Sequence, residues 1–218
     1  MRRHLQRLRT RLQCGLRNGW LSGIEARPSP HRDCRPRGER VTLAVIHYVS
    51  LPAGCFRGDT VDRLFMGTLD EEICTKLDLK GLLGLRVSSH FFIRRNGRIL
   101  QYVDVNARAW HAGLSNFRGR NAVNDFSLGI ELEGTGEVPF GKKQYATLTK
   151  LLKRLARRFP VSAVTGHEFI APGRKADPGP YFDWKRLAKY LPRGVEVAIA
   201  PNDCDRNMLS RRMAELAH

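Results

Sequence analysis

Residues 165–184, which read TGHEFIAPGRKADPGPYFDW, bring three chemically useful side chains into one loop: His167, Lys175 and Asp177. Two Pro-Gly dipeptides inside this loop restrict its backbone, which is typical of a segment that holds a site. An imidazole and a carboxylate are good ligands for Zn²⁺, and a catalytic zinc has three protein ligands and one open position. The loop therefore predicts part of a zinc site whose third ligand and proton acceptor lie elsewhere.

His47 is the candidate for the third ligand. It lies near the end of residues 41–49 (VTLAVIHYV), a run typical of a strand buried on both faces. A histidine in such a strand is more often a satisfied core residue than a metal ligand. If a short strand at 161–165 presents His167 beside it, the two histidines and Asp177 form a three-ligand site.

The proton acceptor is expected in GIELEG, where Glu131 and Glu133 point to the same face of a strand. Both could be solvent-facing carboxylates on a half-exposed strand. Glu131, however, follows Gly129 and Ile130 in an otherwise apolar strand, where an unpartnered charge is costly. Lys175 could stabilise a developing oxyanion, although a loop lysine is usually only solvated.

The elements that must position these side chains alternate irregularly between strands and helices. Asn96-Gly97 suits a tight hairpin turn between two β-prone runs. The pattern predicts an α/β fold, with a central mixed β-sheet flanked by helices. Strands are expected at 41–49, 126–132 and 161–165, a hairpin at 90–103, and helices within 59–80, at 144–159 and at 183–191.

Charge and composition suggest the domain organisation. The formal net charge is +17, and six arginines with no acid lie in residues 1–18. We expect a basic extension at 1–18, one globular domain at 19–192 and an untethered tail at 193–218. The extension is most simply a solvated arm, with contact to nucleic acid or a membrane surface as the alternatives.

Several classes of protein fit the sequence poorly. It has no apolar run long enough to span a membrane and no secretory signal pattern, so the expected compartment is the cytoplasm. The five cysteines contain no C-x-x-C pair, so a cysteine zinc cage is not indicated. Nucleic-acid binding would depend on charge alone, and no nucleic-acid partner is expected. The sequence does not reveal the oligomeric state.

Several segments together resemble one known family. They are RPSPHRDCRP (27–36), VIHYVSLPAGCF (45–56), LRVSSHFFIRRNGRILQYV (85–103), RAWHAG (108–113), NDFSLGIELEG (124–134) and the loop at 165–184. In this order they resemble the zinc-dependent N-acetylmuramoyl-L-alanine amidases related to peptidoglycan recognition proteins. The likeness is greatest to members that act on 1,6-anhydro-muropeptides in peptidoglycan recycling.

The resemblance implies a role for each matched residue. His47, His167 and Asp177 match the zinc ligands, Glu131 the residue that activates water, and Lys175 the residue that stabilises the tetrahedral intermediate. Four positions match segments that contact or line the substrate site: Arg86, Trp110, His111 and Tyr48. Trp110 could equally be a core aromatic. Tyr48 stands where the family commonly has asparagine, which changes one expected substrate contact.

The implied function is hydrolysis of the amide between the muramyl lactyl group and L-alanine of an anhydro-muropeptide. Two alternatives share the fold: a non-catalytic peptidoglycan-binding protein, and an amidase that cuts intact cell wall.

Overall fold

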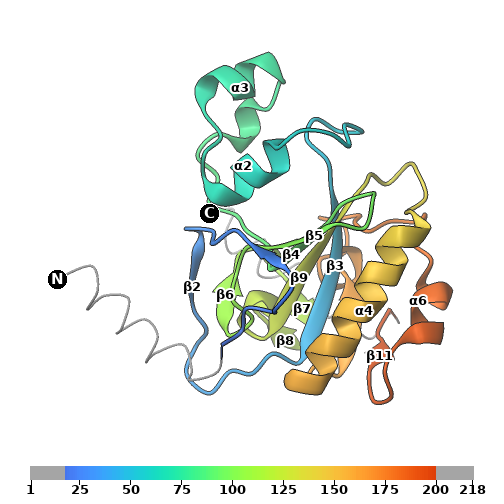
Figure 1. Ribbon diagram of the computed structural model, residues 1–218. Coiled ribbons are helices and arrows are strands. Elements are labelled where there is room, and N and C mark those ends of the chain that lie inside the picture. The colour runs from blue at the N-terminus through green and yellow to red at the C-terminus, as the bar shows by residue number, and fades with distance from the viewer. Residues whose placement is uncertain (1–17, 200–218) are drawn as a thin grey trace.

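A seven-stranded mixed sheet organises the computed structural model, which describes residues 18–199 (Figure 1). The strand order is β1-β5-β4-β9-β3-β10-β11, and β3 lies between β9 and β10, parallel to both. The predicted α/β class with a central mixed sheet is confirmed. Its strands are β1 (Glu25–Ala26), β3 (Leu43–Val49), β4 (Phe91–Ile93), β5 (Ile99–Gln101), β9 (Ser127–Glu133), β10 (Ala163–Gly166) and β11 (Glu196–Val197).

Helices and two small two-stranded sheets complete the described chain. The small sheets pair β2 with β6 and β7 with β8. The remaining elements are β2 (Arg32–Cys34), β6 (Ala107–Ala109), β7 (Asn116–Phe117), β8 (Arg120–Asn121), α2 (Thr60–Met66), α3 (Glu71–Lys76), η1 (Lys80–Leu82), η2 (Val123–Asp125), α4 (Lys142–Arg158), α5 (His167–Ile170) and α6 (Trp184–Tyr190).

The two faces of the sheet are covered by different elements. On one face, Ile46 of β3 and Ile130 of β9 join a core that includes Leu148 and Leu152 of α4. Because side chains alternate along a strand, the next residues of β3 and β9, His47 and Glu131, face away from α4. The functional face is therefore the one that α4 leaves free.

Helix α4 begins two residues before the predicted start at 144, and it ends at Arg158, ahead of Phe159 and Pro160. Its buried stripe includes Tyr145, Leu148, Leu152 and Leu155, the 3.6-residue pattern expected from the sequence. Burial of one apolar stripe against a sheet, with cations on the opposite side, fixes the helix on the sheet.

The helices expected within 59–80 are confirmed as two helices and a 3₁₀ turn, because Gly67 ends α2 in the left-handed region with φ at 66° and Asp70 caps α3. One expectation about the chain needs correction. The tail expected from 193 is not untethered in its described part, because β11 pairs with β10 and extends the sheet past residue 192. Residues 200–218 and 1–17 lie outside the described chain, so the proposed three-part division stays a prediction.

Candidate metal centre

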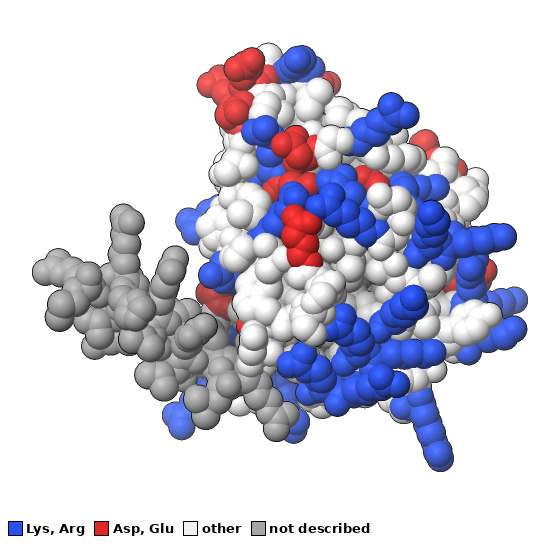
Figure 2. Space-filling view, in the orientation of Figure 1, with Lys and Arg blue, Asp and Glu red and all other residues white. Residues whose placement is uncertain are grey.

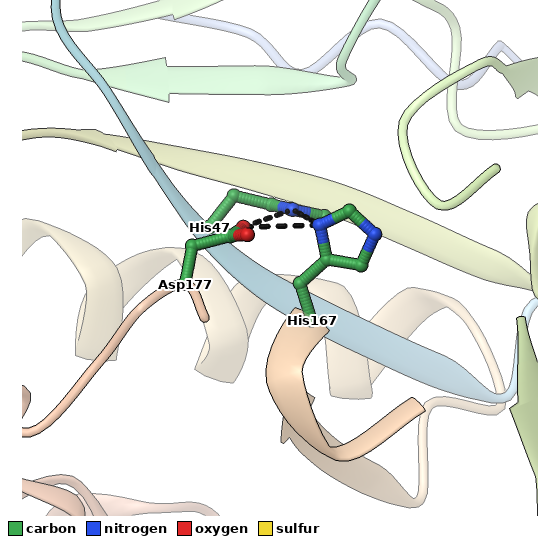
Figure 3. A group of neighbouring side chains, drawn as sticks. All are labelled: His47, His167 and Asp177. Atoms are coloured by element: carbon green, nitrogen blue, oxygen red, sulfur yellow. Dashed lines mark hydrogen bonds and ion pairs between the residues drawn. The ribbon is translucent and has the colours of Figure 1, made fainter. Parts of the chain in front are cut away.

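His47, His167 and Asp177 converge on one point (Figure 3). The Nδ1 atoms of the two histidines are 3.0 Å apart, and Oδ2 of Asp177 lies 2.9 Å from Nδ1 of His47 and 3.1 Å from Nδ1 of His167. Both imidazoles are buried. The structure thus brings together the three residues that the sequence predicted as metal ligands.

Parallel pairing of two strands explains why residues 120 positions apart in sequence meet. β3 and β10 are neighbours, with Ile46 opposite Gly166. His47 is the next residue on β3, and His167 is the first residue of α5, directly after β10. Carboxyl ends of parallel strands lie at the same edge of a sheet, so both rings are delivered to that edge.

The loop after β10 is folded back so that Asp177 reaches both rings. The Glu168 amide donates to the Asp177 carbonyl at 2.8 Å, and the Arg174 and Lys175 amides donate to the Ala171 carbonyl. Gly166 permits this return, because a Cβ there would lie 2.7 Å from Cδ of Pro178. Backbone hydrogen bonds therefore hold the loop at both ends, as the restricted backbone predicted from the sequence requires.

The hydrogen bonds on the far nitrogens fix which atoms of the rings face the centre. Nε2 of His167 lies 3.0 Å from the carbonyl of Ala112, so Nε2 carries the ring proton. Nδ1 is then bare, that is, unprotonated with its lone pair free. Nε2 of His47 lies 3.0 Å from Nδ1 of His111, and Nε2 of His111 lies 3.3 Å from Oγ of Ser127. We assign a chain of donors from His47 to His111 to Ser127, which leaves Nδ1 of His47 bare as well.

Two bare nitrogens and a carboxylate oxygen this close repel one another unless a cation lies among them. A proton on His47 is disfavoured, because burial, followed by the charge of His167, lowers the pKa of His47 to about 4. Burial alone would raise the pKa of Asp177, but the two imidazoles beside it hold that pKa below its usual range, so the carboxylate is charged. This donor set fits a divalent metal ion.

Asn124 holds the segment that supports both imidazoles. Its side-chain oxygen accepts from the amides of His111 and Ala112, at 3.1 Å and 2.9 Å. Arg174 donates to the carbonyls of Ala112 and Leu114, both at 2.7 Å. The ring partner of His47 and the carbonyl partner of His167 are consequently fixed by one short stretch of backbone.

Glu131 lies beside the triad without a partner for one of its oxygens. It is opposite His47 in the β3–β9 register and on the same face of the sheet. Within residues 18–199 its buried Oε2 meets no hydrogen-bond donor. Burial, and next the charge of Asp177, raise the pKa of Glu131 well above its usual value, while Lys175 opposes this shift. A buried carboxyl with a raised pKa at the edge of a site is a candidate for proton transfer.

The charge of Lys175 acts on both Glu131 and His47, although its side chain is exposed. The loop at 165–184 thus presents a cation to the same face as the carboxyl. The residues that the sequence predicted for catalysis, Glu131 and Lys175, are near each other and near the triad; their chemical roles stay predictions.

The four residues expected to bind substrate have different surroundings. His111 joins the triad through His47, so the structure gives it a supporting position. Trp110 is exposed, with the Arg108 guanidinium 4.3 Å above its ring. Arg86 is exposed and makes no hydrogen bond or ion pair with the triad within residues 18–199. Tyr48 packs with the core on the α4 side of the sheet, because it follows His47 on the strand.

Sequence reasoning missed the supporting residues, Asn124, Ala112 and Arg174, and the position of His111 behind His47. One signal was present: Gly129 interrupts the apolar strand β9, and a glycine inside a strand marks a close approach. A Cβ at Gly129 would lie 2.5 Å from the His111 ring and 2.8 Å from Oγ of Ser89. The glycine provides the space in which His111 lies.

The sequence pattern of the N-acetylmuramoyl-L-alanine amidase family matches residues 37–180. The chain belongs to this family, which confirms the resemblance seen in its motifs. Among curated relatives, it is similar to the 1,6-anhydro-N-acetylmuramyl-L-alanine amidase AmpD of Enterobacter cloacae, with 48% identity over 84% of this chain and 98% of the relative. AmpD of Escherichia coli (strain K12) is 49% identical over 79% of this chain and 94% of the relative.

Solved structures agree with this family. A crystal structure of a selenomethionine derivative of AmpD matches with a TM-score of 0.77 and 47% identity, covering 81% of this chain and 98% of that chain. The amidase AmiD of E. coli, in complex with the substrate anhydro-N-acetylmuramic acid-L-Ala-D-gamma-Glu-L-Lys, matches with a TM-score of 0.52 and 32% identity, over 72% of this chain and 60% of that chain. A human peptidoglycan recognition protein, at 17% identity and a TM-score of 0.51, shares the fold.

Proposed function

We propose that the chain is a zinc amidase that hydrolyses the bond between the lactyl group of 1,6-anhydro-N-acetylmuramic acid and L-alanine in muropeptides. One observation carries the proposal: a metal-fitting triad and a buried carboxyl with an oxygen that has no partner in residues 18–199 lie on one face of paired strands. The names of the AmpD relatives, and the substrate in the AmiD complex, support the choice of amide bond.

His47, His167 and Asp177 would hold the zinc ion. Two nitrogen ligands and one oxygen ligand suit Zn²⁺ and leave one position of a tetrahedron open. When bound, Zn²⁺ supplies Lewis acidity, which polarises the scissile carbonyl and lowers the pKa of water near it.

Glu131 takes the proton of the attacking water on Oε2, the atom without a partner, and returns it to the amine of the leaving L-alanine. Its raised pKa, caused first by burial, makes it a stronger base than a solvated glutamate. Lys175 is placed to stabilise negative charge that develops on the carbonyl oxygen, since its charge already reaches Glu131 and His47. Because both His47 and His167 are fixed by outer hydrogen bonds, the reacting groups need little rearrangement.

Digestion of an anhydro-muropeptide, followed by mass spectrometry with and without a chelator, tests the proposal. We expect release of the alanine-terminated peptide, and its loss when zinc is removed. The variant Glu131→Gln tests the proposed base, because glutamine keeps the shape of the side chain but not its basicity. It should retain zinc while turnover falls by about 10²- to 10⁴-fold.

Two outcomes would replace this proposal. Binding of the muropeptide without cleavage at saturating zinc would make the chain a non-catalytic peptidoglycan-binding protein. Faster cleavage of polymeric cell wall than of anhydro-muropeptides, measured side by side, would make intact peptidoglycan its substrate. The cytoplasm stays the predicted compartment.

A further inference from the structure

The outer surface of α4 carries an unusual concentration of positive charge. Every charged residue of this helix is basic. Most of them lie opposite the buried apolar stripe, with Arg158 at its border, and all are exposed or half-exposed. We call this surface the α4 basic face: Lys142, Lys143, Lys150, Lys153, Arg154, Arg157 and Arg158.

These cations are not neutralised by neighbouring acids. Among the ion pairs within residues 18–199, none involves a member of the α4 basic face. Arg154 and Arg158 donate to the backbone carbonyls of Ser22 and Asn18. Because a backbone carbonyl is neutral, these hydrogen bonds do not cancel the guanidinium charges. In the space-filling view, lysines and arginines predominate over the region of α4 and α6 (Figure 2).

Neighbouring segments extend the positive surface. α6 packs beside α4 and adds Lys185, Arg186 and Lys189, together with Tyr190, whose side chain is 48% exposed. The arginine-rich extension joins the described chain at Asn18, which Arg158 contacts at the carboxyl-terminal end of α4. Tyrosine favours the boundary between water and lipid, because one end of its ring is apolar and the other polar.

We propose that the α4 basic face docks the protein on a membrane surface rich in anionic phospholipid. A helix of this length presents a convex ridge of about 25 Å. Lipid headgroups diffuse within their plane, so one can gather beneath each cation of a convex surface. Each lysine or arginine near such a surface contributes about fivefold to the partition coefficient.

Duplex nucleic acid fits the same surface less well. Its phosphates are fixed on a cylinder, and two convex surfaces meet over a small area, so few of the seven cations could be used together. Docking through α4 also leaves the triad accessible, because His47 faces away from α4. The proposal is independent of the amidase assignment, since it concerns the opposite side of the sheet.

Vesicle flotation of the full-length, folded protein tests this docking. Vesicles of phosphatidylcholine with about one third phosphatidylglycerol would be compared with pure phosphatidylcholine, at low and physiological salt. We expect binding to the anionic vesicles that weakens as salt rises, because the Debye length falls to about 8 Å at 0.15 M. A 30-base-pair DNA duplex, followed by fluorescence anisotropy under the same conditions, is the competing ligand.

The decisive variant reverses three charges of the face, Lys150→Glu, Lys153→Glu and Arg157→Glu. Its matched control reverses three exposed cations of the segment 57–80, which lies outside α4: Arg57→Glu, Lys76→Glu and Lys80→Glu, with the same change in net charge. The α4 variant should lose about 100-fold or more of its partition coefficient, as three cations at about fivefold each predict. The control should keep binding within about threefold, and circular dichroism should show both variants folded.

Four results would overturn the proposal: no binding of the wild-type chain to anionic vesicles, equal binding to neutral vesicles, equal losses in the α4 and control variants, or tighter binding to the duplex than to vesicles. Amidase turnover serves as an independent readout. It should be unchanged in the α4 variant, whose substitutions lie outside the candidate metal centre.

Discussion

Replacement of His111 is the sharpest test of the supporting hydrogen bonds around the candidate metal centre. Nε2 of His47 donates to Nδ1 of His111 across 3.0 Å; His47 is buried and His111 is half-buried. This bond leaves the proton on Nε2 and the lone pair on Nδ1, where the metal ion is expected. His111→Leu fills the same space without an acceptor, so the buried Nε2–H group of His47 should lose its hydrogen bond.

The magnitude follows from the cost of one unsatisfied buried donor, about 1–3 kcal/mol. Loss of an outer hydrogen bond to a ligand histidine typically weakens metal affinity by about 10- to 100-fold, which agrees with that range. His111→Ala should be milder than His111→Leu, since the smaller side chain leaves room for a water molecule to accept the proton. His111→Gln retains an acceptor and should restore much of the affinity.

Competition with a chromophoric zinc chelator measures this affinity directly, without reference to turnover. The matched control is His31→Leu, because both ring nitrogens of His31 are buried and have no hydrogen-bond partner among the described residues, and it lies outside the triad. Zinc affinities of His111→Leu and wild type within about twofold of each other would refute the reasoning. So would an equal loss in His31→Leu, since the effect would then be general destabilisation.

Three further outcomes are expected. Gly129→Ala should lower both zinc affinity and melting temperature, because its Cβ would lie 2.5 Å from the His111 ring; unchanged calorimetry and zinc titration would contradict the close approach. Arg174→Ala should speed zinc release more than Arg174→Lys does, because alanine cannot donate a hydrogen bond to the Ala112 carbonyl. Stopped-flow mixing with excess chelator measures the release rates, and equal rates for the two variants would contradict this. Since the pKa of His47 is lowered to about 4, protons compete weakly for Nδ1, so zinc should be retained down to about pH 5 and lost towards pH 4; loss already near pH 6.5 would contradict the stated pKa.

Strong apolar periodicity made the centre of the fold predictable from sequence. Strands β3 and β9 and helix α4 bury nearly continuous apolar runs or a clear 3.6-residue stripe, so their positions could be predicted to within a few residues. The strands β1, β2 and β6 have two or three residues each, several of them charged. Neighbouring strands determine their pairing, so the local sequence contains no pattern that predicts them.

The candidate ligands could be predicted because their side-chain types carry the chemistry. Their support could not, because it consists largely of backbone groups: the Ala112 carbonyl for His167, and the amides held by Asn124. Any residue type can offer a backbone carbonyl, so the sequence contains no signature for it. The family resemblance placed His111 in the segment that lines the substrate cleft, which stays a prediction, and the structure adds its contact with His47.

Strand register is the feature that couples the candidate metal ligands to the candidate base. His47 and Glu131 lie opposite each other on parallel strands, and both must point away from α4 for the site to exist. A slip of one residue would turn Glu131 into the apolar core. Ile130 and Leu132, fully buried against the α4 side, oppose such a slip, since it would bring them to the polar face. The core that holds α4 on the sheet therefore also sets the position of Glu131 beside the triad, and loss of packing under α4 should weaken catalysis through Glu131 before it releases the metal ligands.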